Sequence, residues 1–191
     1  MTRVSIPVLL LLAIPAFAGD IHGKVIAKGM RDSSDAAVYV DSIPSKTFAP
    51  PTAHARIDQK GLQFLPHVLP VVVGTTVDFL NSDSVLHNVF SPDACADHFD
   101  LGTWPQGQTK TFTFKKACFA ALLCKVHPEM EGFVAAVPTP YFAVTSPNGS
   151  YQINDVPDGT YTVKAWHPKL KTATKSVTVK GATEANFTIA K

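Results

Sequence analysis

The sequence predicts an all-β protein. Apolar and polar residues alternate in short runs, most clearly at 111–114, and a two-residue period is typical of half-buried strands. Fifteen prolines and eleven glycines separate these runs, and no stretch after residue 18 has the pattern of a helix of two turns. Apolar residues make up 46% of the chain, which is enough for a packed core rather than a disordered chain.

The first two thirds of the chain contain runs rich in β-branched and aromatic residues between turn signals. The segment 118–126 is almost entirely apolar, as expected of a strand buried on both faces. The interval 91–108 is interrupted by Pro and Gly and is expected to be a loop. The expected strands in this part are 21–27, 36–41, 71–73, 76–80, 85–90, 109–115, 118–126 and 132–137.

In the last third of the chain, the spacing of the expected strands is more regular. Five short runs follow each other at intervals of about ten residues, a spacing typical of β-sandwiches. Turn sequences such as Pro147-Asn-Gly149 separate them. The expected strands are 141–145, 150–153, 160–166, 173–179 and 185–189.

Residues 1–18 are typical of a secretory signal. Arg3 precedes the apolar run 8–14, and Ala16-Phe17-Ala18 is a small-x-small cleavage sequence. The run is shorter than the ~20 residues that a spanning helix needs, so we expect no membrane span. The sequence therefore predicts cleavage after Ala18 and a secreted or periplasmic protein, with an uncleaved membrane anchor as the alternative.

Charge excludes one class of partner. The formal net charge is +2, from 17 basic and 15 acidic residues, so basic and acidic residues are nearly balanced. Because phosphate backbones are bound by clustered basic faces, we expect no nucleic-acid partner.

The segment Cys124-Lys-Val-His127-Pro-Glu-Met130 carries three soft or borderline metal ligands within seven residues. A fourth, His87, lies upstream in an expected strand. Two histidines, one cysteine and a weak axial methionine are the ligand set of a blue-copper electron-transfer site. A structural zinc site more often uses closely spaced Cys/His pairs, of which there is one. Alone, a buried Cys or Met in such a chain is usually core filler.

The cysteine count is consistent with a metal-bound thiolate. The chain has three cysteines, and in an oxidising compartment an odd number implies one pair and one remaining thiol. If Cys124 binds metal, Cys95 and Cys118 are left to form a disulfide. The alternative is that these two are buried free thiols.

Residues 52–137 resemble cupredoxins, the family of plastocyanin and amicyanin. The resemblance rests on 71–83, on His87-Asn88-Val-Phe-Ser and on the Cys-x-x-His-x-x-Met segment 124–130, whose short His–Met gap resembles amicyanin. It implies an eight-stranded Greek-key β-sandwich with one mononuclear copper ion.

In that family resemblance, His87, Cys124 and His127 are the trigonal ligands and Met130 is the axial ligand. Asn88 ties the two ligand loops together and donates from its backbone to the Cys124 sulfur. The 91–108 loop with Cys95 departs from the family pattern, as does Cys118 in the strand before the site. Among the other histidines, His98 in this loop is the alternative ligand.

The end of the chain resembles the transthyretin-like sandwich of carboxypeptidase regulatory domains, on the segment 148–167. Such a domain starts with Gly-x-Val and a strand, and both stand at the other end of the chain, at 23–25 and 36–40. We therefore expect residues 20–51 and 138–191 to form one small sandwich into which the copper unit is inserted or which flanks it. The alternative assigns 20–50 to the cupredoxin's own first strands.

The predicted function is that of a one-electron carrier whose redox partner proteins dock transiently near His127. We expect no enzymatic activity, because a buried site of this kind has no open position for a substrate. The alternative is a copper-handling or extracellular interaction module without redox turnover. A metal-free structural protein is the remaining possibility.

Overall fold

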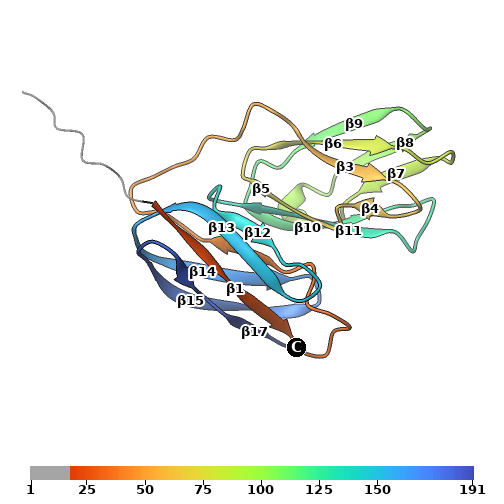
Figure 1. Ribbon diagram of the computed structural model, residues 1–191. Coiled ribbons are helices and arrows are strands. Elements are labelled where there is room, and N and C mark those ends of the chain that lie inside the picture. Colours follow the sequence, from red (N-terminus) through yellow and green to blue (C-terminus); the bar gives the residue numbers. More distant parts are fainter. Residues whose placement is uncertain (1–17) are drawn as a thin grey trace, which may run out of the picture.

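The computed structural model describes residues 18–191, so the predicted signal segment lies outside it except for Ala18. Figure 1 shows the strands gathered into two β-sandwiches that pack side by side. We call them the central sandwich, formed by the middle of the chain, and the terminal sandwich, formed by its two ends. Among the described residues no helix has the length and hydrophobicity of a membrane-spanning segment.

The central sandwich consists of two sheets with the strand orders β4-β3-β6-β9 and β5-β11-β10-β7-β8. The pairs β3–β6 and β5–β11 are parallel, and the others are antiparallel. Its elements are β3 (Ala55–Gln59), β4 (Phe64–Leu65), β5 (Val68–Val72), β6 (Thr76–Asn81), β7 (His87–Phe90), the 3₁₀ helix η1 (Ala94–Ala96), β8 (Asp100–Trp104), β9 (Thr109–Thr113), β10 (Cys118–Leu123) and β11 (Glu131–Val137).

The terminal sandwich also has two sheets, β12-β2-β14-β15 and β13-β1-β16, with β17 paired to β1 beyond β16. Strands from the start of the chain therefore pair with strands from its end. The elements are β1 (Ala18–Ala27), β2 (Ala37–Val40), β12 (Phe142–Val144), β13 (Ser150–Pro157), β14 (Gly159–His167), β15 (Leu170–Val179), β16 (Thr183–Glu184) and β17 (Phe187–Ile189).

The all-β class and the pair of sandwiches are confirmed, but three strand predictions were wrong. β8 lies inside 91–108, where a loop was expected, and β3 was not predicted at all. The expected strand 185–189 is shorter, because Ala185 and Asn186 lie between β16 and β17 and only Phe187–Ile189 is a strand. β8 was missed because only Trp104 of its five residues is buried, so the strand shows no alternation.

Three apolar layers hold the four sheets together. One fills the central sandwich, one fills the terminal sandwich, and the third lies between the two sandwiches; we call this third layer the seam. Successive side chains of β11 belong to different layers, because neighbours on a strand point to opposite faces. Val134 and Ala136 lie in the central core, whereas Phe133, Ala135 and Val137 lie in the seam.

The seam is formed by the faces of β5, β11 and β10 on one side and of β2, β12 and β14 on the other. Across the seam, the rings of Phe119 and Trp166 stack, with their centroids 4.5 Å apart and their planes inclined by 15°. The buried seam residues are Ala37, Tyr39, Val68, Phe133, Ala135 and Val137, and Phe119, Ala121, Phe142, Val144 and Trp166 pack against them.

The chain crosses between the sandwiches twice, and the two crossings lie side by side. Thr139 donates its hydroxyl proton to the Val40 carbonyl oxygen (2.6 Å), and the Val40 amide donates to the Tyr141 carbonyl oxygen (2.9 Å). Both crossings are rich in proline, which restricts the backbone.

Candidate metal centre

His87, Cys124 and His127 converge at one end of the central sandwich. Their potential ligand atoms all lie within 4.8 Å of one another. The His87 Nδ1 atom is 3.9 Å from the Cys124 sulfur and 3.1 Å from Nδ1 of His127. His87 and Cys124 are almost fully buried, and His127 is half-buried. These three side chains therefore present two imidazole nitrogens and one sulfur to a common point.

Strand pairing explains the convergence of residues that are far apart in the sequence. β7 and β10 run antiparallel, with Phe90 opposite Leu123. His87 begins β7, and Cys124 follows the last residue of β10. Because the two strands are antiparallel, both residues lie at the same end of the strand pair. The chain then turns, and the Met130 amide donates to the His127 carbonyl oxygen (3.0 Å).

Met130 lies with Cys124 in the central core, where it is 1% exposed. β11 begins at the next residue, Glu131. Gly132 gives this strand a close approach to Phe64, because a Cβ atom there would lie 2.7 Å from the Phe64 Cβ. The position of Met130 thus depends on the packing of β11.

Asn88 connects the two ligand segments. Its backbone N–H points at the Cys124 sulfur (3.4 Å), and its side-chain oxygen accepts from the Lys125 amide (3.2 Å). Its side-chain nitrogen donates to Asp100 and to the Gly102 carbonyl oxygen, both at 2.8 Å. The oxygen of this buried side chain therefore ties β7 to the loop of Cys124, and its nitrogen ties β7 to β8.

Asp83 is a neighbour of the candidate site that the sequence interpretation missed. Its carboxylate lies 2.9 Å from Nε2 of His87, on the side of the ring opposite to the cluster. An N–H at Nε2 that donates to this carboxylate leaves Nδ1 free to bind a metal. The interaction had no sequence signal, since Asp83 belongs to an ordinary polar turn.

Neighbouring groups stabilise the ionised form of Asp83. Burial opposes ionisation, but the backbone N–H groups of Leu62 and Gly61, at 3.0 and 2.7 Å, donate to the carboxylate and lower its pKa, as does the His87 ring. A carboxylate that stays ionised is the better acceptor for the His87 N–H.

A second carboxylate, that of Asp100, contacts the loop that follows Cys124. Lys125 donates to it (2.6 Å), and this bond, with those from Gly102 and Asn88, lowers the pKa of Asp100 to about 2. The Lys125 ammonium group also lies over the Phe90 ring, 5.3 Å from its centroid.

The remaining cysteines and His98 stand apart from the cluster. Cys95 and Cys118 are joined by a disulfide that ties η1 to the start of β10, whereas Cys124 is a free buried thiol. His98 instead lies with its Nδ1 atom 2.6 Å from the Pro92 carbonyl oxygen. It is not part of the group of converging ligand atoms.

The donor set fits copper. A thiol and two imidazoles are soft or borderline ligands, and no carboxylate takes part in the converging group, whereas calcium and magnesium require oxygen ligands. The buried Met130 thioether in the same core is a further soft donor. Burial of the sulfur and of one imidazole keeps water away from these donors.

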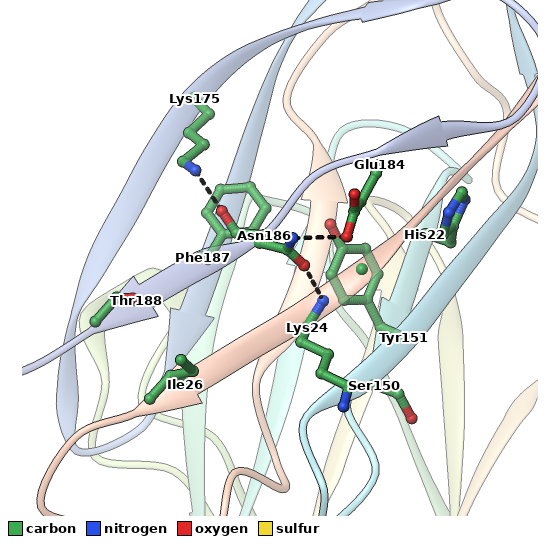
Figure 2. Close-up of a pocket in the computed structure, with 11 residues that line it drawn as sticks. His22, Lys24, Ile26, Ser150, Tyr151, Lys175, Glu184, Asn186, Phe187 and Thr188 are labelled. Atoms are coloured by element: carbon green, nitrogen blue, oxygen red, sulfur yellow. Dashed lines mark hydrogen bonds between the residues drawn. The ribbon is translucent and has the colours of Figure 1, made fainter.

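The terminal sandwich has a groove of about 880 Å³ along β1, β16 and β17. Figure 2 shows Asn186 at the centre of its polar groups, bonded to Lys24, Glu184 and Lys175. The Asn186 side chain accepts from the Lys24 amide (2.7 Å) and donates to Glu184 (2.8 Å), and the Asn186 carbonyl oxygen accepts from Lys175. Asn186 thus bridges the break between β16 and β17.

Comparisons with known proteins find both resemblances that the sequence predicts. Residues 133–190 match the family model of the carboxypeptidase regulatory-like domain. A reduced Cu(I) form of an amicyanin mutant is 26% identical, with a TM-score of 0.42, over 50% of this chain and 96% of that one. A purple cupredoxin from Nitrosopumilus maritimus is 27% identical, with a TM-score of 0.39, over 43% and 98% of the two chains.

A copper-containing nitrite reductase from Thermus scotoductus SA-01 is 24% identical, with a TM-score of 0.43, and the similar region covers 52% of this chain but 25% of the reductase. No curated protein matches the chain. The chain is thus similar in part to solved cupredoxins and in part to the family model of the carboxypeptidase regulatory-like domain.

Proposed function

We propose that this protein is an exported one-electron carrier with a single blue-copper site. The observation that carries the proposal is the convergence of His87, Cys124 and His127 within 4.8 Å. Met130 is the proposed axial ligand. When bound, copper supplies a Cu(II)/Cu(I) couple whose potential depends on the axial ligand and on the surroundings of the thiolate.

The surrounding residues support electron transfer because they hold the ligands from outside. Asp83 orients the His87 ring, and Asn88 fixes the Cys124 loop through its side-chain oxygen and places its backbone N–H at the sulfur. A ligand set held by two strands and their hydrogen bonds changes little in geometry when the charge at its centre changes. That rigidity favours rapid electron exchange over metal release.

Redox partners are proposed to dock near His127. The rings of His87 and His127 lie 4.8 Å apart, and the residues just before them, Leu86 and Val126, are 52% and 43% exposed. Val85 is 43% exposed. An apolar surface beside a half-buried ligand suits a small, transient protein interface.

We further propose that residues 52–137 are inserted into a unit formed by 20–51 and 138–191. Support comes from the pairing of β1 with β13 and of β2 with β12 and β14, and from the neighbouring crossings near Val40 and Thr139. The Cys95–Cys118 disulfide supports an oxidising compartment. Cleavage after Ala18 stays a prediction.

The test is a copper titration of the chain that starts at Gly19. We expect one equivalent of Cu(II) to produce an intense thiolate-to-copper band that a reductant bleaches and an oxidant restores. Cys124→Ser should lose the band, because a hydroxyl is a poor ligand for copper compared with a thiolate. Cys124→Ser that binds and colours like the wild type would refute the proposal.

A copper-handling module is the second candidate, favoured by the half-buried position of His127, through which copper could enter or leave. Repeated redox cycles in the presence of a Cu(I) chelator separate the two candidates. A carrier retains its copper through many cycles, whereas a handling protein loses it to the chelator. An enzymatic role is not proposed, because a fully ligated centre leaves no position for a substrate.

A further inference from the structure

The strand that follows Met130 is covered by the terminal sandwich. β11 begins at Glu131, and its residues are buried on both faces except for Glu131 itself. One face completes the core around the ligands, and the other, with Phe133, lies in the seam. The backbone that carries Met130 therefore leads at once into a strand that the terminal sandwich holds in place.

Two polar contacts cross the seam at this end of β11. Lys169, in the turn between β14 and β15, lies 3.5 Å from the Glu131 carboxylate. Asp35, in the turn between β1 and β2, lies 2.9 Å from Nδ1 of His67. Both acceptor–donor pairs therefore join a turn of the terminal sandwich to the central sandwich next to the ligand loop.

His67, which pairs with Asp35, also contacts Phe133 of β11. Its carbonyl oxygen accepts from the Phe133 amide (2.8 Å), and its ring meets the Phe133 ring edge to face at 5.6 Å. His67, Met130 and Glu131 also line one small cavity of about 220 Å³. Lys169 thus contacts the first residue of β11, and Asp35 contacts the segment just before β5. Both of these segments lie next to Met130.

We propose that Asp35 and Lys169 are positioning residues that hold the Met130 segment against the central sandwich and thereby tune the proposed copper site. The inference rests on the proposed function. It gives the terminal sandwich a role in setting the redox potential, in addition to any partner that it binds.

The expected consequence follows from the weak axial bond. An axial thioether would bind copper weakly and at a long distance. A small increase in the mobility of the Met130 segment would therefore reduce the electron donation from its sulfur. Reduced donation destabilises Cu(II) more than Cu(I), and the reduction potential rises. Both ion pairs are partly exposed and stabilise the fold little, so their loss should move the potential without unfolding the protein.

The experiment compares Asp35→Asn, Lys169→Met and the double variant with the wild type. Lys164→Met is the matched control, since Lys164 pairs with Asp41 (2.8 Å) within the terminal sandwich. Voltammetry gives the potential of the copper-loaded proteins. Amide hydrogen exchange at Met130 and Phe133 in the copper-free proteins gives the freedom of the segment directly.

We expect a higher potential and several-fold faster exchange in each seam variant, with the largest changes in the double variant and none in Lys164→Met. Exchanging the charges, with Lys169→Glu and Glu131→Lys together, should bring both readouts back towards the wild type. A merely stabilising role would leave the potential unchanged.

The inference is overturned if the seam variants keep the wild-type potential, whatever their exchange rates, or if Lys164→Met changes as they do. Failure of the proposed function looks different, because the wild type itself would then show no blue band. In that case the exchange rates still decide whether Asp35 and Lys169 hold the segment.

Discussion

The ligand cluster of the central sandwich and the groove of the terminal sandwich differ in how their polar groups are satisfied. In the groove, the Asn186 side chain and carbonyl oxygen are bonded to neighbouring protein groups (Figure 2). In the cluster, the outer nitrogen of His87 is bonded to Asp83, whereas its inner nitrogen faces only Cys124 and His127.

This difference bears on which of the two regions is suited to bind a ligand. Buried polar atoms normally find partners. In the cluster, the Nδ1 atoms of His87 and His127 and the Cys124 sulfur face one another, an arrangement that a single bound ion could satisfy. The groove has a volume of about 880 Å³, yet its hydrogen bonds close a break between two strands. A large volume is therefore not by itself a sign of a binding site.

The largest expected effect is loss of metal at the cluster. Cys124→Ala should weaken copper binding by more than a hundredfold, roughly, since even residues that only orient ligands contribute about 10–100-fold. The copper-free protein should lose only about 1 kcal/mol of unfolding free energy, because a small buried group is replaced by another. Competition with a copper chelator measures the first quantity and denaturant unfolding the second.

Asp83→Asn should have the next largest effect. Loss of the carboxylate opposite the ligand nitrogen of His87 is expected to weaken copper binding about 10–100-fold while a band remains. Asp58→Asn is the control, because Asp58 accepts from Ser82 in the same region and contacts no ligand. Equal affinities of the two variants would show that Asp83 does not orient His87.

Asn186→Ala tests the other side of the comparison. Removal of the two side-chain bonds should lower the unfolding free energy by about 1–2 kcal/mol, and the copper band should not change. Asn154→Ala, which removes one exposed bond to Gln152, should change stability by less than about 0.5 kcal/mol. An altered copper spectrum in Asn186→Ala would contradict a purely structural role for the groove.

The smallest expected effect is the pH dependence of the Asp35–His67 pair. Asp35 raises the pKa of His67, so this contribution to stability is complete below pH 6.5 and is lost as the pH rises through the raised value. Glu131 adds to this shift, whereas burial and Lys169 oppose it. His67 lowers the pKa of Asp35, so the carboxylate's contribution is complete above pH 3.8 and is lost on acidification through the lowered value.

The pair should therefore stabilise the protein most between about pH 4 and 6.5, by less than about 1 kcal/mol because both groups are about one third exposed. Unfolding of the wild type and of Asp35→Asn should differ more at pH 5 than at pH 8. The same difference at both values would show that the pair does not titrate with folding.

Local patterns were sufficient for much of the fold. Most of the alternating run at 111–114 lies in β9. The apolar run at 118–126 contains β10, which ends at Leu123 and whose side chains alternate between the central core and the seam. Such strands are predictable because the period of two and the apolar composition are properties of the segment itself. β3 and β8 lacked that signal, and only their pairing with β6 and β7 makes them strands.

The donor types could be predicted from the sequence, since the spacing of Cys124, His127 and Met130 is a property of one short loop. The surroundings of those donors follow from the tertiary structure. Asp83 reaches His87 through the shape of a turn, and Lys169 reaches Glu131 across a packed seam. Contacts of this second kind depend on how sheets stack, and stacking is fixed by burial over the whole chain rather than by any local pattern.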